Sequence, residues 1–222
     1  MNTKKRVFDV HIIESNKPTE RDAEGDALAG ILTISDIQAH KYIVKTIPEL
    51  QDAILRIAKH PRCIPHHRHF LPFLHFALHA NRTGILLRGK ELVEWSDLLD
   101  LLLPLRKRLE GNLLICMSAC EGFYGYQMAC SAERFPYHFM IGSRKKIDWR
   151  DGILAYHIFY HSLLFRKARL PEAVAAMNTG LLSRGYSFDY TYGSEVQRLS
   201  SQHAFTNDER VVAVRGKGNK IT

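Results

Sequence analysis

The sequence predicts one α/β domain over residues 1–222, in which a mostly parallel sheet is covered by helices on both faces. Its 222 residues, 45% of them hydrophobic, are enough to bury the core of a single large domain. Short apolar stretches alternate with amphipathic stretches of helical length, as strands joined by helical crossovers do. Two apolar stretches, at 73–78 and 113–119, contain no charged residue, which is typical of strands buried on both faces.

The first third of the chain is expected to contain two strands, a loop and a helix. β-Branched, aromatic and apolar residues predict strands at 7–13 and 38–45. The polar segment from Asn16 to Asp26 is expected to be an exposed loop, and residues 16–27 are expected to be flexible. Thr46 is followed three residues later by a Glu, with Pro in between, and this capping-box pattern predicts a helix that reaches about residue 59.

The rest of the chain continues the alternation of strands and helices. In order, we expect a histidine-rich connector, the first uncharged strand, a hairpin, a leucine-rich helix and the second uncharged strand at 60–69, 73–79, 81–95, 96–108 and 113–119. A short helix, a strand and two longer helices are expected at 124–132, 138–141, 150–165 and 172–177. Ser96 and Pro171 are residue types that start helices. The tail at 204–222 is expected to be flexible.

Composition and charge favour a globular protein without a membrane partner. The longest stretch without a charged residue, Gly152–Phe165, has 14 residues and includes two histidines, so it is too short and too polar to span a bilayer. The net charge of +8 is spread over scattered residues and carries no nucleic-acid-binding motif. We therefore do not expect a nucleic-acid partner. The positive charge is just as compatible with an acidic partner protein as with nucleic acid.

The four cysteines show no paired spacing of the CxxC kind. They are Cys63, Cys116, Cys120 and Cys130. Free thiols in the reducing cytoplasm explain this pattern better than a disulfide framework does. A cytoplasmic location is therefore expected.

Two residues able to perform nucleophilic catalysis lie at the ends of the two uncharged strands. His79 closes the first, Cys120 closes the second, and 41 residues separate them. If the two strands are neighbours and parallel, both side chains emerge at the carboxyl edge of the sheet, where open α/β sheets place their active sites. An imidazole beside a thiol favours the reactive thiolate. We therefore predict a His79–Cys120 dyad.

The remaining candidates are interpreted as structural. Cys116 lies inside its strand and is expected to pack there, and His75 alternates with its strand neighbours and is expected to have a core or surface-packing role. The histidines at 66, 67 and 69 suit Zn²⁺, but no Cys or carboxylate follows them at ligand spacing. His157 and His161 have the i, i+4 spacing of zinc peptidases without the Glu between them. We therefore assign no metal and no cofactor.

Two segments resemble the catalytic motifs of caspase-like cysteine peptidases. Phe73–Ala80, which reads FLHFALHA, resembles the catalytic-histidine strand of the prokaryotic CHAT and caspase-like branch, and Ser118–Gly122, which reads SACEG, is similar to the motif that carries the nucleophile. The resemblance covers roughly residues 40–180. It implies a caspase-hemoglobinase-like fold with a mostly parallel six-stranded sheet, and cysteine-type endopeptidase (thiol protease) activity.

The resemblance also implies roles for individual residues. Cys120 would attack the scissile carbonyl, His79 would transfer the protons, and the backbone N–H groups of Cys120 and Ala80 would bind the oxyanion. The family usually has Gly where this chain has Ala80, and a positive φ there would be unfavourable for Ala.

Substrate binding is expected from residues beside the motif and in the loop at 147–151. Ser118 stands where relatives that cleave after Lys or Arg carry Asp, and Glu121 follows the nucleophile. Asp148 and Asp151 would favour a basic substrate side chain, whereas Arg150 would favour an acidic one. Of the two, we expect a preference for a basic substrate side chain.

The resemblance implies an effector of antiviral defence or programmed cell death in bacteria. Its substrate would be a protein, and a separate sensor protein or a nucleotide second messenger would activate it. The alternative is a catalytically inactive caspase-fold module that recruits a partner or a nucleotide, which Ala80 favours slightly. A basic nucleic-acid-associated protein is a third and weaker interpretation.

Overall fold

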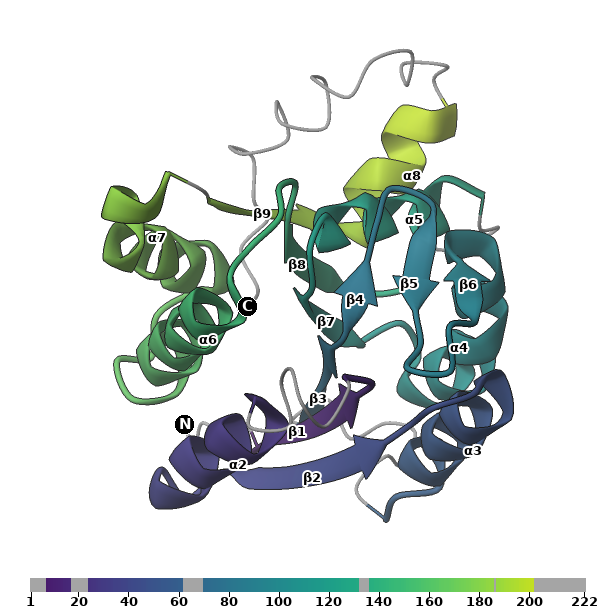
Figure 1. Ribbon diagram of the computed structural model, residues 1–222, viewed down its shortest axis with the longest axis horizontal. Helices are drawn as coiled ribbons and strands as arrows, with labels where there is room; N and C mark the ends of the chain where they lie inside the picture. Colours follow the sequence, from purple (N-terminus) through teal and green to yellow (C-terminus); the bar gives the residue numbers. More distant parts are fainter. Residues whose placement is uncertain (1–6, 17–23, 62–69, 132–135, 186, 202–222) are drawn as a thin grey trace, which may run out of the picture.

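The protein has an α/β fold built on a six-stranded, mostly parallel sheet (Figure 1). The computed structural model describes residues 7–16, 24–61, 70–131, 136–185 and 187–201. The strands lie in the order β2 (Gln38–Ile43), β1 (Val7–Glu14), β3 (Phe70–Ala77), β7 (Leu114–Ser118), β8 (Phe139–Ser143) and β9 (Phe188–Tyr192). The first five are parallel, and β9 runs antiparallel to β8 at the edge.

Helices cover both faces of the sheet, and each layer has its own hydrophobic core. One layer contains α3 (Ile47–Ala58), α4 (Trp95–Leu109), α5 (Met128–Ser131) and α8 (Gly193–Ser201). The other contains α2 (Glu24–Ile34), α6 (Trp149–Leu164) and α7 (Leu170–Gly180). In Figure 1, α6 and α7 lie to the left of the sheet and α4 to the right. Two short 3₁₀ helices, η1 (Gly122–Gln127) and η2 (Leu182–Arg184), complete the helices of the described segments.

The helix α3 forms as its sequence signals predict. Thr46 is the N-cap, and its hydroxyl accepts a hydrogen bond from the backbone N–H of Glu49 at 3.5 Å. The Glu49 carboxylate accepts one in return from the N–H of Lys45 at 2.6 Å. Leu50, Ile54 and Ile57 are buried against the sheet, so local capping and core burial agree on this helix.

A small three-stranded sheet follows β3 and carries His79. Its strands are β4 (His79–Ala80), β5 (Gly84–Leu86) and β6 (Leu92–Glu94), all antiparallel. The turn between β4 and β5 is held by Asn81, whose Oδ1 accepts from the N–H of Thr83 at 2.8 Å and that of Gly84 at 3.1 Å. A Cβ on Gly84 would lie 2.1 Å from the carbonyl oxygen of Val93, so only Gly fits there.

The N-terminal segment differs from its sequence prediction. The exposed loop expected at 16–26 is wrong at both ends, because Asn16 and Glu24 are almost fully buried and α2 begins at Glu24. Positions 17–23 lie outside the described residues. The Nδ2 of Asn16 donates to the carbonyl oxygen of Ala77 at 3.1 Å, which fixes this residue at the end of β3.

Other parts of the prediction have mixed outcomes. The helix expected at 124–132 is η1 followed by α5, while β9 and α8 were not predicted. Most of the histidine-rich connector, including His66, His67 and His69, and the tail at 204–222 lie outside the described residues. None of the helices in the described segments is long and apolar enough to cross a membrane.

Candidate active site at the carboxyl edge of the sheet

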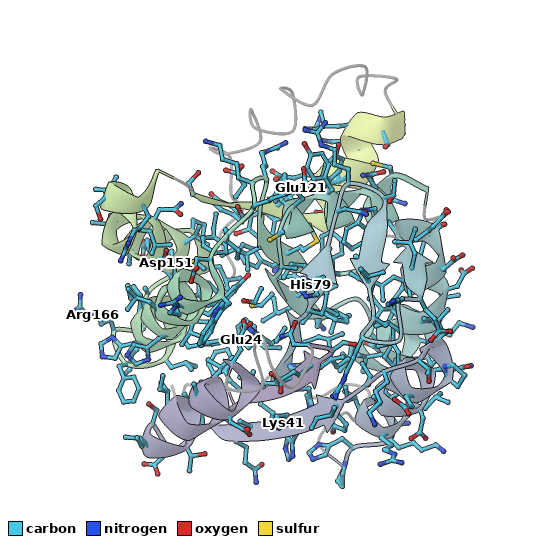
Figure 2. The ribbon with its side chains drawn as sticks, in the orientation of Figure 1. Glu24, Lys41, His79, Glu121, Asp151 and Arg166 are labelled. Atoms are coloured by element: carbon cyan, nitrogen blue, oxygen red, sulfur yellow. The ribbon has the colours of Figure 1, made fainter. Side chains whose placement is uncertain are left out.

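His79 and Cys120 follow neighbouring parallel strands at the same edge of the sheet. Ala77 at the end of β3 is the register partner of Ser118 at the end of β7. His79 and Cys120 each lie two residues beyond these partners. Because adjacent strands lie about 4.8 Å apart, this register brings both residues to one edge. Figure 2 shows His79 in the middle of the molecule, on strand β4 of the small sheet.

The Cys120 side chain lies in a tight turn between β7 and η1. Its thiol is partly exposed and donates to the carbonyl oxygen of Ile147 at 3.7 Å. The next residue, Glu121, has φ = 55°, a left-handed conformation that few residues other than Gly adopt. The N–H of Glu121 donates to the carbonyl oxygen of Lys145 at 3.1 Å. The turn is thus held against the loop that precedes α6, in a conformation of the kind that concentrates at functional sites.

An ion pair joins the segment after His79 to the segment after Cys120. Arg82 Nε lies 3.3 Å from Glu121 Oε1. The guanidinium carbon of Arg82 also lies 5.2 Å from the ring centroid of Tyr124. The carbonyl oxygen of Arg82 accepts from Trp95 Nε1 at 3.0 Å and from Gln127 Nε2 at 2.9 Å. Arg82 therefore connects β4, η1 and α4 around the two candidate residues.

Two other described cysteines have thiols that are hard to ionise. Cys116 is fully buried, and burial raises its pKa to about 12. Burial also raises the pKa of Cys130. The thiolate is the reactive form, so neither thiol suits nucleophilic attack at neutral pH. The core position predicted for Cys116 is confirmed.

Ser118 contacts an acidic residue that sequence reasoning missed. The Ser118 hydroxyl donates to Glu24 Oε1, and both residues are 2% exposed. Glu24 starts α2 and lies 94 positions away in the chain. A Cβ on Gly152, in the first turn of α6, would lie 3.3 Å from the Ser118 Oγ. A buried carboxylate therefore contacts the residue two positions before the candidate nucleophile, at the meeting point of α2, β7 and α6.

A second buried carboxylate belongs to the same region. Glu14, 3% exposed at the end of β1, accepts from the N–H of Gly25 at 3.2 Å, and its Oε2 lies 3.7 Å from Lys41 Nζ. Lys41 also donates to Asp26. Burial alone would lower the pKa of Lys41, but the hydrogen bond to Asp26 and the charge of Glu14 raise it. Lys41 is therefore a fixed cation that offsets part of the local negative charge (Figure 2).

The predicted substrate-binding residues of the 147–151 loop make local contacts. Asp148 is the N-cap of α6 and accepts from the N–H of Arg150 at 2.9 Å. Arg150 is exposed, with its Nε 3.5 Å from Asp148 Oδ1. Asp151 pairs with Arg184 at 3.4 Å, on the α6–α7 side of Figure 2. The contact between Cys120 and Ile147 brings the start of this loop to the nucleophile, whereas Asp151 is engaged elsewhere.

Ala80 does not have a positive φ, so its Cβ carries no left-handed penalty. It pairs with Ile85 in the small sheet, and the neighbouring N–H of Asn81 donates to the carbonyl oxygen of Gly84 at 3.0 Å. Hydrogen bonding alternates along an antiparallel pair, so the N–H of Ala80 points away from β5. It therefore makes no ladder hydrogen bond with β5.

Of the histidines interpreted as structural, those in the described segments lie in the expected elements. His75 is fully buried, its Nδ1 lies 3.3 Å from the Tyr160 hydroxyl, and burial lowers its pKa to about 3. His157 and His161 lie on α6 with ring centroids 6.2 Å apart, and the His161 ring stacks on Phe165.

A scan of the sequence against protein-family models finds no match, and no curated protein matches it either.

Proposed function

We propose that this protein is a caspase-like cysteine endopeptidase in which Cys120 is the nucleophile and His79 transfers the protons. The observation that carries the proposal is the register of β3 and β7, which pairs Ala77 with Ser118 and so sends His79 and Cys120 to the same sheet edge. The six-stranded sheet with helices on both faces is compatible with a caspase-hemoglobinase-like fold. The motifs FLHFALHA and SACEG supply the family resemblance.

The residues support a two-step acyl transfer. The thiol proton of Cys120 passes to His79, and the thiolate attacks the scissile carbonyl carbon. The N–H groups of Cys120 and Ala80 stabilise the resulting oxyanion, His79 gives the proton to the leaving amine, and the C–N bond breaks. His79 then takes a proton from water, whose oxygen attacks the thioester, and Cys120 leaves with that proton restored. Loss of one oxyanion donor in such sites costs about 3 kcal/mol of barrier.

The proposed active conformation requires a change at Cys120. In the structure the thiol donates to the carbonyl oxygen of Ile147. A rotation about the Cα–Cβ bond would release this contact and free the sulfur for the reaction. This contact supports a resting state that a separate sensor or a nucleotide signal activates, as expected for an effector of bacterial defence or cell death. It equally favours the inactive binding module as the second candidate.

We propose a basic residue on the amino side of the scissile bond. Of the acidic residues near Cys120, Glu24 is the best placed to receive it, because its partner Ser118 lies two residues before the nucleophile. An ionised carboxylate can accept several hydrogen bonds, so a Lys or Arg head group can join the Ser118 hydroxyl on it. Ser118 and Glu24 would then do together what an Asp at the Ser118 position does in relatives that cleave after basic residues. Arg150, the candidate for an acidic preference, is 75% exposed and already paired with Asp148.

Peptide cleavage by matched variants tests the function. Wild type, Cys120→Ala, His79→Ala and Cys130→Ala are incubated under reducing conditions with fluorogenic peptides that end in Arg, Lys or Asp. We expect wild type and Cys130→Ala to cleave the Arg and Lys peptides and the two dyad variants to lose the activity. Equal cleavage by all four proteins would contradict the assignment.

Thiol reactivity distinguishes a dormant peptidase from a binding module if no cleavage is seen. Iodoacetamide at mildly acidic pH, followed by peptide mass spectrometry, reports the alkylation rate of each cysteine. A peptidase site should alkylate fastest at Cys120, and His79→Ala should slow that reaction. A Cys120 as slow as Cys130 in wild type would favour the binding module.

A further inference from the structure

Four residues with metal-binding side chains gather on the α3 side of the sheet, away from the catalytic edge. Asp9 and His11 alternate on β1 and therefore point to the same face. His40 on β2 is the register partner of His11. His60 follows the end of α3 and returns to this face of the sheet. We call this set the Asp9–His60 cluster.

The side chains of the Asp9–His60 cluster are in close contact. One ligand atom each from Asp9, His11 and His60 lies within 4.8 Å of the other two. The His11 ring stacks on His40 with centroids 5.0 Å apart and meets the His60 ring edge-on at 5.4 Å. The His40 and His60 centroids are 4.9 Å apart. Three imidazoles and one carboxylate thus converge on a small volume.

Burial makes this convergence costly unless the polar atoms are satisfied. Asp9 and His11 are both 0% exposed. Within the described part of the chain, His11 Nε2 and His60 Nδ1 are buried and have no hydrogen-bond partner. A buried polar atom without a partner is destabilising, because it has lost its hydrogen bonds to water. Two such nitrogens beside a buried carboxylate therefore point to a ligand between them.

We propose that Asp9, His11 and His60 bind a divalent transition-metal ion, best matched by Zn²⁺, with His40 or water at the fourth position. Neutral imidazole nitrogen and carboxylate oxygen are zinc ligands, and three or four of them form a tetrahedral site. Ligand atoms around such an ion lie roughly 3.3 Å apart, as follows from metal–ligand distances of about 2.0–2.1 Å. The ligand atoms of Asp9, His11 and His60 already lie within 4.8 Å of one another, so binding would require them to draw closer.

The second contact of His11 fits a metal ligand. Its Nδ1 lies 3.4 Å from the Tyr42 hydroxyl, which leaves Nε2 directed to the cluster. Metal-ligating histidines commonly hold their other nitrogen in a hydrogen bond, and this fixes the ring and its tautomer. Burial and the neighbouring His40 and His60 lower the pKa of His11 to about 3, so its imidazole is neutral at physiological pH.

The proposed ion would have a structural role. Asp9 lies five residues before Glu14, the end of β1, which places the cluster on the order of 16 Å along the strand from the catalytic edge. His60 lies between α3 and the connector that leads to β3. An ion held by β1 and His60 would therefore fix the end of α3 to the sheet and anchor the chain that enters the His79 strand.

Metal analysis of the untagged full-length protein tests this site. We expect protein purified without chelator to contain about one zinc per chain, and the stripped protein to rebind one Zn²⁺ with a rise in Tm. His60→Gln, which keeps a polar side chain of similar length, should weaken Zn²⁺ binding by roughly 100-fold or more, since loss of even an outer-shell partner costs 10–100-fold. The control is His161→Ala, which removes one histidine of the His157–His161 pair on α6. This variant should bind Zn²⁺ like wild type.

Cobalt provides a readout that does not depend on variant folding. Stripped wild type titrated with Co²⁺ should develop the visible absorption of a tetrahedral site, saturate at one equivalent and lose the bands on addition of Zn²⁺. Absence of zinc rebinding and of these bands in wild type would overturn the proposal and leave a hydrogen-bonded His–Asp network. Loss of binding in His161→Ala but not in His60→Gln would also overturn it.

Discussion

At the scale of single residues, the buried carboxylate of Glu24 is the feature with the clearest functional consequence. Glu24 starts α2, yet its side chain contacts Ser118 on the strand that carries Cys120. A carboxylate in this environment can favour a cation much more strongly than an exposed carboxylate can, because the surroundings screen charge less than water does. Substrate selectivity should therefore depend on this one residue.

Replacement of Glu24 by Gln should selectively impair cleavage after basic residues. The amide keeps a polar contact with Ser118 but loses the charge that attracts Lys or Arg, so kcat/KM for an Arg peptide should fall by about 100-fold, the equivalent of a charge-assisted hydrogen bond of nearly 3 kcal/mol. Asp26→Asn is the matched control, because Asp26 lies on the same helix with a side chain 68% exposed. Equal losses in both variants would argue against a role for Glu24 in selectivity.

Removal of the Arg82–Glu121 pair should affect activity more than stability. An exposed ion pair contributes about 0–1 kcal/mol to folding, so Arg82→Ala should unfold at nearly the same urea concentration as wild type. It should nevertheless slow both peptide cleavage and Cys120 alkylation, because the turn after Cys120 is then held less firmly against β4. Arg56→Ala is the control, since Arg56 is 70% exposed and pairs with Asp52 on α3, whereas Arg82 is 69% exposed. Similar kinetics in the two variants would contradict this interpretation.

The buried His75 should make the fold sensitive to mild acid. Burial lowers its pKa to about 3, whereas an unfolded chain has a His pKa near 6.5, so the unfolded state binds more protons between these values. Stability should thus fall as pH drops below about 6.5, and His75 alone should account for about 2 kcal/mol between pH 7 and pH 5. Urea unfolding of wild type and His75→Gln at both pH values measures this share. An equal pH dependence in the two proteins would disprove it.

At the scale of elements, local signals predict a helix or strand well where capping and burial agree. The capping box at Thr46, the turn at Asn81 and the uncharged stretches of β3 and β7 all lie in the expected elements. The helix α2 was missed because two glycines and the preceding charged segment look like a loop. Leu28 and Leu32, four residues apart and both buried, carry the signal that could have identified it. The edge strand β9 is short and tyrosine-rich, and it can be recognised only from its long-range pairing with β8.

A pair of glycine substitutions tests how tightly the small sheet is built. Gly84→Ala would place a Cβ 2.1 Å from the Val93 carbonyl oxygen, so β5 and β6 must separate and stability should fall by about 2–3 kcal/mol. Gly30→Ala, in α2, meets no atom within 4 Å and should stabilise the protein by about 0.5–1 kcal/mol. Thermal unfolding of both variants gives the comparison. A neutral Gly84→Ala would mean that β5 and β6 separate at little cost.

At the scale of the whole molecule, the sheet topology is what makes the candidate site predictable. Parallel neighbours end at one edge, so residues that close two strands are expected to meet there without further information. The meeting of Ser118 with Glu24 is different, because it depends on how α2 packs across the sheet and has no local signature. The same is true of the Asp9–His60 cluster, whose members come from β1, β2 and the end of α3.

Cross-linking tests the neighbourhood of His79 and Cys120 without any assay of activity. His79→Cys should form an intrachain disulfide with Cys120 under mild oxidation, because each lies two residues beyond the paired Ala77 and Ser118. A disulfide needs Cα atoms about 4.4–6.8 Å apart. Peptide mass spectrometry of the oxidised protein identifies the bond. His161→Cys, on the far side of α6, should leave Cys120 reduced. A free Cys120 in oxidised His79→Cys would refute the arrangement.

The solvent-accessible Arg82–Glu121 contact implies that the two turns of the candidate site respond to the ionic environment. Mobile ions weaken attraction between exposed charges over a Debye length of about 8 Å at physiological ionic strength and about 3 Å at 1 M. Concentrated salt should therefore weaken the contact between the two turns, while the hydrophobic cores beneath them stay packed. At high salt concentration, the rate of peptide cleavage should therefore fall while the protein is still folded.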